Sequence, residues 1–99
     1  MIIISQVEFP PGSSKDIGKC FTKLPALPAY LTMNGPYFRA SVGGGIKSIN
    51  LYICDNAHTS EALVFVNSRL TAYYDVPGFT YSCDAWLEVA EALKMVGLG

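Results

Sequence analysis

The chain has 99 residues, of which 51% are hydrophobic and only 15% are charged, and its formal net charge is −1 at pH 7. Its length suits a single modest core, so we expect residues 1–99 to form one domain. The seven basic residues are scattered, with no cluster to neutralise phosphates, which argues against nucleic-acid binding. So few charged residues leave little polar material for the surface, and we therefore expect part of it to be buried against a second copy.

The cysteines and the first residues bear on the compartment. Cys20, Cys54 and Cys83 are an odd number of widely spaced thiols without a Cys-x-x-Cys pair, a pattern typical of free cysteines in a reducing cytoplasm. Residues 1–4 are apolar, but the run is too short for a signal peptide or a membrane span. We therefore expect a cytoplasmic protein without a membrane segment, and no motif indicates a metal or a cofactor.

The N-terminal third predicts a strand followed by a helix. Residues 1–9 are apolar on both faces at the start, which favours a central strand, and Pro10-Pro11-Gly12 ends it. Ser13 or Ser14 is expected to cap a helix, and prolines follow it at 25 and 28. Its apolar stripe consists of Ile17, Cys20, Phe21 and Leu24. Residues 29–33 have no clear pattern, and 34–36 are expected to form a turn.

The central stretch, residues 37–55, predicts an antiparallel hairpin around Gly43-Gly44-Gly45. Its second strand alternates between an apolar set and a polar set. The apolar set is Lys47, Ile49, Leu51 and Ile53, and the polar set is Ser48, Asn50, Tyr52 and Cys54. We expect helices to cover the apolar set and the polar set to remain open.

The last part predicts a helix, a strand and a final helix. Thr59 or Ser60 is expected to cap the first of these helices, with Glu61 and Arg69 on its outer side. Its buried stripe is Leu63, Val66, Leu70 and Tyr73 or Tyr74. Residues 79–83 alternate as a strand, and Asp84 is expected to cap the final helix. The apolar stripe of that helix is Trp86, Val89, Ala90, Leu93 and Val96.

This order of elements indicates an α+β fold of the ferredoxin-like type. The expected arrangement is βαββαβ, a four-stranded antiparallel sheet with two helices on one face, plus a C-terminal helix. Three stretches, 9–12, 75–81 and 86–89, resemble small proteins of the dimeric α+β barrel superfamily. That resemblance implies a homodimer or higher homo-oligomer in which two open sheet faces enclose a cavity. The extra C-terminal helix is a departure; it either covers the open face or exchanges between subunits.

The candidate ligand site lies on the open sheet face. Its members are Glu8, Tyr37, Arg39, Asn50 and Tyr52, with Gln6 and Ser48 beside them, and His58 is a further candidate ligand-binding residue. If the face is enclosed, Arg39 and Glu8 must pair or bind something, because an unpaired buried charge is costly. One interpretation is a small polar or anionic ligand held by Arg39. The other is an ion pair between subunits, with aromatic packing around it.

His58 is the only histidine and precedes the second helix. Its ordinary pKa suits a general base, but it lacks neighbours at metal spacing, so a structural or exposed loop role is the simpler interpretation. The run from Gly43 to Ser48 resembles a phosphate loop only superficially, because Ile46 separates the glycines from Lys47 and a strand follows.

Three functional hypotheses remain open. The first is a non-catalytic homo-oligomer that binds or senses a small ligand between subunits. The superfamily resemblance also implies a cofactor-free enzyme of the monooxygenase or isomerase kind, with His58, Arg39 or Tyr52 as acting groups. The third hypothesis is a protein-interaction module that uses exposed aromatic residues and the last helix. Fold alone does not choose among them.

Overall fold

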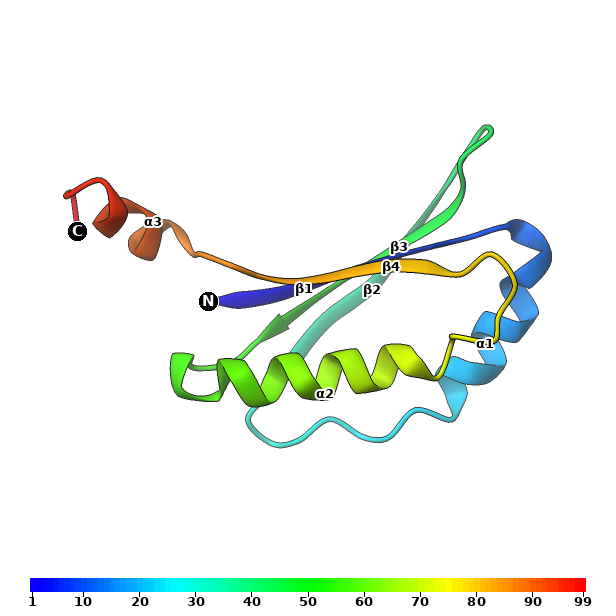
Figure 1. Ribbon diagram of the computed structural model, residues 1–99, viewed down its shortest axis with the longest axis horizontal. Coiled ribbons are helices and arrows are strands. Elements are labelled where there is room, and N and C mark those ends of the chain that lie inside the picture. Colours follow the sequence, from blue (N-terminus) through cyan, green and yellow to red (C-terminus); the bar gives the residue numbers. More distant parts are fainter.

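A computed structural model describes all of residues 1–99 and shows an α+β fold (Figure 1). The strands are β1 (Ile2–Phe9), β2 (Thr32–Ser41), β3 (Gly45–Ile53) and β4 (Thr80–Trp86). The α-helices are α1 (Ser14–Thr22), α2 (Thr59–Thr71) and α3 (Val89–Met95), and short 3₁₀ turns, η1 (Pro11–Ser13) and η2 (Asn56–His58), precede α1 and α2.

The four strands form one antiparallel sheet in the order β2-β3-β1-β4. The expected central position of the first strand is confirmed, because β1 pairs with β3 on one side and β4 on the other. The expected hairpin is also confirmed. Gly43 and Gly45 in its turn have φ angles of 75° and 73°, a conformation that glycine adopts without steric cost. This arrangement is compatible with a ferredoxin-like fold.

Two element boundaries differ from the sequence-based expectation. Residues 34–36 lie inside β2 as a bulge, between the pairs Asn34–Leu51 and Tyr37–Ile49, rather than in a turn before it. A bulge accommodates Pro36 because the ladder is already interrupted there. At the other end, β4 continues to Trp86 and pairs with Ile2, so the final helix begins at Val89 rather than at Asp84.

The assignment of sheet faces was wrong. Tyr52 lies opposite Ile3 and Asn50 lies opposite Ser5, on the side covered by α1 and α2; Ile3 is fully buried and Tyr52 is 3% exposed. This side, the covered face, includes the residues predicted to remain open. Alternation states which residues share a face but not which face the helices cover.

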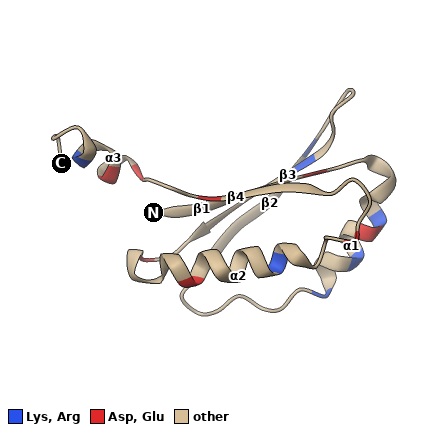
Figure 2. Cartoon of the chain, viewed as in Figure 1, with Lys and Arg blue, Asp and Glu red and all other residues tan.

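The other side, the open face, is the more aliphatic one. It presents Ile2, Ile4, Gln6 and Glu8 of β1 and Lys47, Ile49, Leu51 and Ile53 of β3, together with Tyr37, Arg39, Thr80, Ser82, Asp84 and Trp86 of the edge strands. Ile49 is 37% exposed and Trp86 50%. All the charged residues of the sheet lie on this face, and Figure 2 shows how few they are.

The core lies between the covered face and the helices. Its buried members are Ile3, Phe9, Ile17, Leu31, Tyr52, Ala62, Val66, Leu70, Tyr73 and Val76. α2 contacts β1 and β4, whereas α1 lines a cavity together with residues of β2 and of the first part of β3. The α1 stripe is only partly buried, since Phe21 remains 42% exposed.

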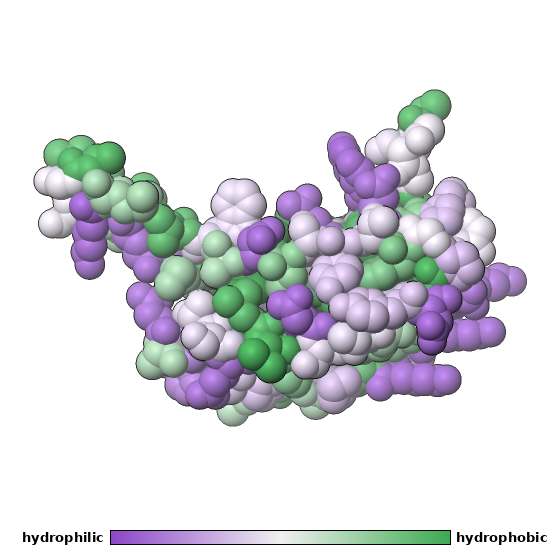
Figure 3. Space-filling model, viewed as in Figure 1, coloured by the Kyte–Doolittle hydropathy of each residue, from purple (hydrophilic) through white to green (hydrophobic).

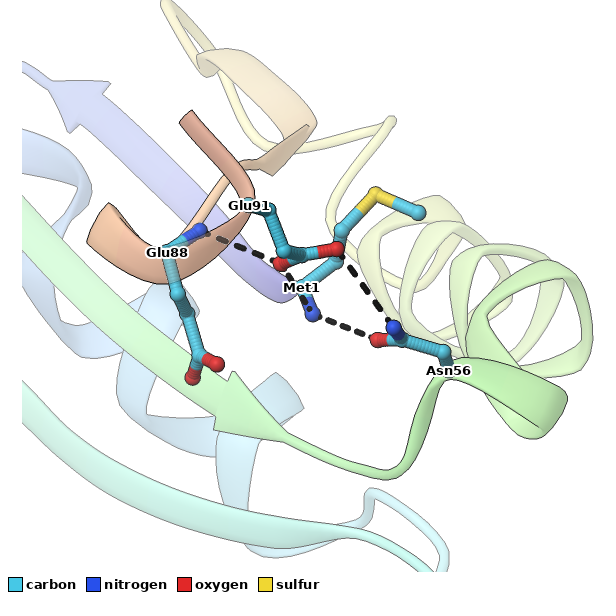
Figure 4. Close-up of polar contacts among 4 residues, drawn as sticks. All are labelled: Met1, Asn56, Glu88 and Glu91. Carbon is cyan, nitrogen blue, oxygen red and sulfur yellow. Dashed lines mark hydrogen bonds and ion pairs between the residues drawn. The ribbon is translucent and has the colours of Figure 1, made fainter. Parts of the chain in front are cut away.

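α3 lies beyond the end of the sheet, away from the other two helices (Figure 1). Polar contacts hold it near the N-terminus: the Met1 ammonium lies 2.9 Å from Glu91 Oε1 and donates to Asn56 Oδ1 at 2.7 Å (Figure 4). Glu91 also accepts from the backbone N–H of Glu88, within a capping box at the start of the helix. Its apolar side chains Val89, Leu93 and Met95 are exposed, as are Val96 and Leu98 after the helix.

Two apolar projections therefore flank the open face. One is α3, and the other is the tip of the β2–β3 hairpin, where Val42 is fully exposed. Figure 3 shows both as hydrophobic protrusions with a hollow outline between them. None of the helices has the length and hydropathy needed to cross a membrane.

Candidate functional site

A cleft of about 670 Å³ lies on the open face. Open-face side chains from all four strands line it: Gln6 and Glu8, Tyr37 and Arg39, Lys47 and Ile49, and Thr80 and Ser82. It therefore spans the full width of the sheet. Of the predicted site residues, Glu8, Tyr37 and Arg39 are brought together here.

The charges in this cleft do not balance. Arg39 lies directly opposite Lys47 on β3, which in turn lies opposite Glu8 on β1, so the three form one row across the sheet. Glu8 Oε2 is 4.0 Å from Lys47 Nζ, and Arg39 has no ion-pair partner. Two cations directly opposite each other repel, and a single carboxylate neutralises only one of them. The cleft therefore carries a surplus positive charge.

A second hollow, here called the inner cavity, lies between the covered face and the helices. Its volume is about 440 Å³. Its polar lining residues are Ser5, Ser14, Ser48, Asn50, Tyr52, Arg69 and Tyr73. The remainder is largely apolar, including Phe9, Ile17, Phe21, Phe38, Ile46 and Leu70. Asn50 and Tyr52, predicted for the open face, belong to this cavity instead.

Arg69 is the residue that the sequence analysis misplaced most. It was expected on the outer side of its helix, but it is only 8% exposed. Its Nη1 donates to the carbonyl oxygen of Pro25 at 2.9 Å, and its Nε has no partner. A helical signal was present, because Ala62, Val66 and Arg69 follow the i, i+4, i+7 spacing of one face.

The tyrosines of the inner cavity remain protonated at neutral pH. Burial raises the pKa of Tyr73 to about 12, and burial also raises the pKa of Tyr52, although the positive charge of Arg69 opposes that rise. Burial likewise raises the pKa of the Cys83 thiol. These groups are thus neutral hydrogen-bonding groups rather than bases or thiolate nucleophiles.

His58 lies outside both hollows. Its Nδ1 is 2.6 Å from Asp55 Oδ1, and its ring stacks on Tyr30 with 4.5 Å between the centroids. The hydrogen bond from His58 holds the pKa of the Asp55 carboxyl below its ordinary value. Asp55 also accepts from the backbone N–H of His58, so the pair caps the turn that leads into α2.

The structure therefore separates the three groups proposed for catalysis. Arg39 lies in the open-face cleft, Tyr52 lies beneath the sheet in the inner cavity, and His58 lies at the start of α2. They do not converge on one position where a substrate atom could react. Lys47 was missed as a site residue because the alternation pattern grouped it with the isoleucines.

No group of three or more His, Cys, Asp or Glu side chains is placed to hold a metal ion. Comparison of the chain with models of known protein families finds no match, and comparison with curated proteins finds none either. The functional argument therefore depends on the two hollows themselves.

Proposed function

We propose that this protein is a homodimer of ferredoxin-like subunits, of the dimeric α+β barrel type, that binds or senses a small anionic ligand between its two open faces. The observation that carries this proposal is the unpaired Arg39 in the cleft, beside Lys47 and on a sheet face that the chain leaves uncovered.

The uncovered face supports the choice of a second copy as its occupant. Aliphatic residues of both central strands lie on it, and the projections at either end are apolar too. The charged row already contains both signs, with Glu8 at one end and Arg39 at the other. A copy related by a twofold axis presents the same row in reverse, which is the self-complementary pattern of an isologous interface.

The shape of the chain supports the same occupant. α3 and the hairpin tip extend past the two ends of the sheet, and their apolar side chains contact little of their own subunit (Figures 1 and 3). In the proposed dimer these projections pack around the opposite subunit. Dimerisation thus buries both the open face and the apolar side chains of the projections. α3 thus exchanges between subunits instead of closing over its own sheet.

The charge of the cleft determines the class of ligand. The two positive charges of Arg39 and Lys47 exceed the one negative charge of Glu8. A small anion therefore neutralises the remaining positive charge once water is excluded. Arg39 offers a planar, bidentate donor, and Tyr37 on the same strand adds a hydroxyl. The three free cysteines support a reducing compartment such as the cytoplasm for this function.

The test is a melting-temperature screen of the purified protein with phosphate, sulfate, acetate and benzoate. A ligand present at 100 times its Kd stabilises the folded state by about 2.7 kcal/mol, so a bound anion raises the melting temperature measurably. We expect at least one of these anions to do so, and we expect Arg39→Gln to abolish the rise. Lys19→Gln is the matched control, because Lys19 is an exposed cation on α1 outside the cleft.

Two results would contradict the ligand proposal. One is a flat screen, and the other is an equal rise in wild type and Arg39→Gln. The competing interpretation, an ion pair between Arg39 and the partner's Glu8, predicts instead that Glu8→Gln and Arg39→Gln weaken dimerisation to a similar extent without any ligand. In the ligand-bound dimer, Glu8→Gln increases the positive charge of the cleft and tightens anion binding.

A further inference from the structure

The inner cavity contains a buried cation without an anion. Arg69 is only 8% exposed and forms no salt bridge. Arg69 also lines a smaller hollow of about 230 Å³ with Lys23 and Pro25. Neither this hollow nor the inner cavity has an aspartate or glutamate in its lining. Removing a charged group from water without a counter-charge is energetically costly. A carboxylate within the protein would be the usual compensation, and here it is missing.

The contacts that Arg69 does make leave one edge of its guanidinium free. Nη1 donates to Pro25 O, the Tyr52 hydroxyl lies beside the guanidinium, and the Phe65 ring lies 5.9 Å from the guanidinium carbon. Nε is buried and has no acceptor. The edge that includes Nε is one of the two that a carboxylate engages with a pair of parallel hydrogen bonds. Pro25 therefore fixes the side chain, and a carboxylate reaches the Nε edge only when the side chains packed against it move aside.

A second unsatisfied polar atom lines the same cavity. Asn50 Oδ1 is buried and has no hydrogen-bond donor. Buried polar groups are nearly always paired, so the orphan Arg69 Nε indicates a missing hydrogen-bond partner, whereas Asn50 Oδ1 lies against Gly35 of the β2 bulge. The Tyr52 and Ser5 side chains, each 3% exposed, add two hydroxyls to this polar end.

The rest of the cavity determines the body of the ligand. Its lining is mainly aliphatic and aromatic, and its volume of about 440 Å³ lies within the range of small-molecule sites. Phe21 on α1 and Phe38 on β2 line it and are 42% and 59% exposed, so the cavity reaches the surface between these two elements. Ser5, Tyr52 and Arg69 lie on β1, β3 and α2, away from that opening, whereas Ser48 is the cross-strand partner of Phe38.

We infer that the inner cavity binds a monocarboxylic acid with an apolar body, whose carboxylate is held by the Nε edge of Arg69. The apolar body extends past Ile17, Leu70 and Phe21 toward the opening. This site is separate from the open-face cleft, and the sheet lies between them.

The experiment titrates the wild-type protein with decanoate, 1-decanol and decylamine below their aggregation concentrations. The readout is the side-chain Nε–H signal of Arg69 in a ¹H–¹⁵N spectrum, together with the melting temperature. Decanoate should shift this signal in a saturable way and raise the melting temperature. The alcohol and the amine should bind at least tenfold more weakly. Because the protein is unmodified, this result does not depend on any variant folding.

Variants then separate this site from the open-face cleft. Arg69→Met keeps a long apolar side chain without charge and should bind decanoate and decanol equally. Arg39→Gln should leave decanoate binding unchanged, so failure of the open-face proposal and failure of this one are distinguishable. The inference is overturned if decanol matches decanoate in wild type, if decanoate perturbs Arg39 instead of Arg69, or if none of the three probes binds.

Discussion

The two faces of the sheet differ in how burial and polarity are combined. The covered face packs against helices yet includes Ser5, Asn50 and Tyr52, and Arg69 reaches it from α2. The open face has no cover within the chain yet presents aliphatic residues of β1 and β3 beside a few charges. Polar groups enclosed on one side and apolar groups exposed on the other both indicate that the chain is completed by something else. On the covered side we propose a carboxylic acid, and on the open side a second subunit.

The two faces also differ in the kind of partner that each suits. The inner cavity is apolar with one cationic group, so it suits a small molecule with one negative charge. The open face is wide and apolar and lies between two projections, so it suits a protein surface of similar area. A substitution on the covered face should therefore change the stability of one subunit. A substitution on the open face should change how strongly two subunits associate.

The largest expected effect on stability comes from substituting one of two adjacent isoleucines on β1. Ile3 is fully buried on the covered face, and Ile4 is on the open face. Ile3→Ala should lower the free energy of unfolding by about 2–5 kcal/mol, because it leaves a cavity in the core. Ile4→Ala should act mainly through association, so its melting temperature should depend on protein concentration. Denaturation of both variants at two protein concentrations measures the difference; equal, concentration-independent losses would remove the distinction between the faces.

A smaller effect concerns how α3 is attached to the rest of the chain. Polar contacts hold α3, whereas apolar packing holds α2. The Met1 ammonium holds the pKa of Glu91 below its ordinary value of 4.5, and Glu91 holds the pKa of the ammonium above 8.0. Because the pKa of Glu91 is lowered in the folded state, the ionised carboxylate stabilises the contact above about pH 4.5. This contribution is lost as the pH falls through the pKa of Glu91 in the folded protein. The raised amine pKa stabilises it below about pH 8 and is lost as the pH rises further.

Backbone ¹⁵N relaxation of residues 89–95 measures this attachment. We expect greater picosecond-to-nanosecond mobility of α3 at pH 3 than at pH 6, and Glu91→Gln at pH 6 should reproduce the acid result. Glu61→Gln, an exposed carboxylate on α2, is the control and should change nothing in α3. If α3 stays rigid in acid and in Glu91→Gln, its apolar contacts with a partner hold it rather than this ion pair.

Much of the fold was predictable from local patterns. The alternation through β3, the glycines at 43 and 45 and the prolines after Phe9 specify a hairpin and the end of the first strand, and the structure confirms both. These signals are local because they reflect the conformations that each residue adopts. The bulge at Gly35-Pro36 was missed, since the same dipeptide is equally typical of a turn.

The candidate site was less predictable, because it depends on which face the helices cover. Ile49 and Tyr52 alternate regardless of that choice, and a pattern based on hydropathy assigned the isoleucine to the core. The structure places the tyrosine there instead, 3% exposed and lining the inner cavity together with Arg69. Arg69 itself was assigned to solvent because of its charge, although its helical position favoured the core.

The central claim is that a second copy covers the open face, and sedimentation velocity of the purified protein tests it most directly. We expect a dimer at micromolar concentration that Ile49→Lys converts to a monomer, since Ile49 is 37% exposed on that face. Val64→Lys is the matched control, because Val64 is an apolar residue 69% exposed on α2, away from the open face, and the dimer should persist. A wild-type monomer, or a dimer that Val64→Lys disrupts and Ile49→Lys does not, would contradict the account.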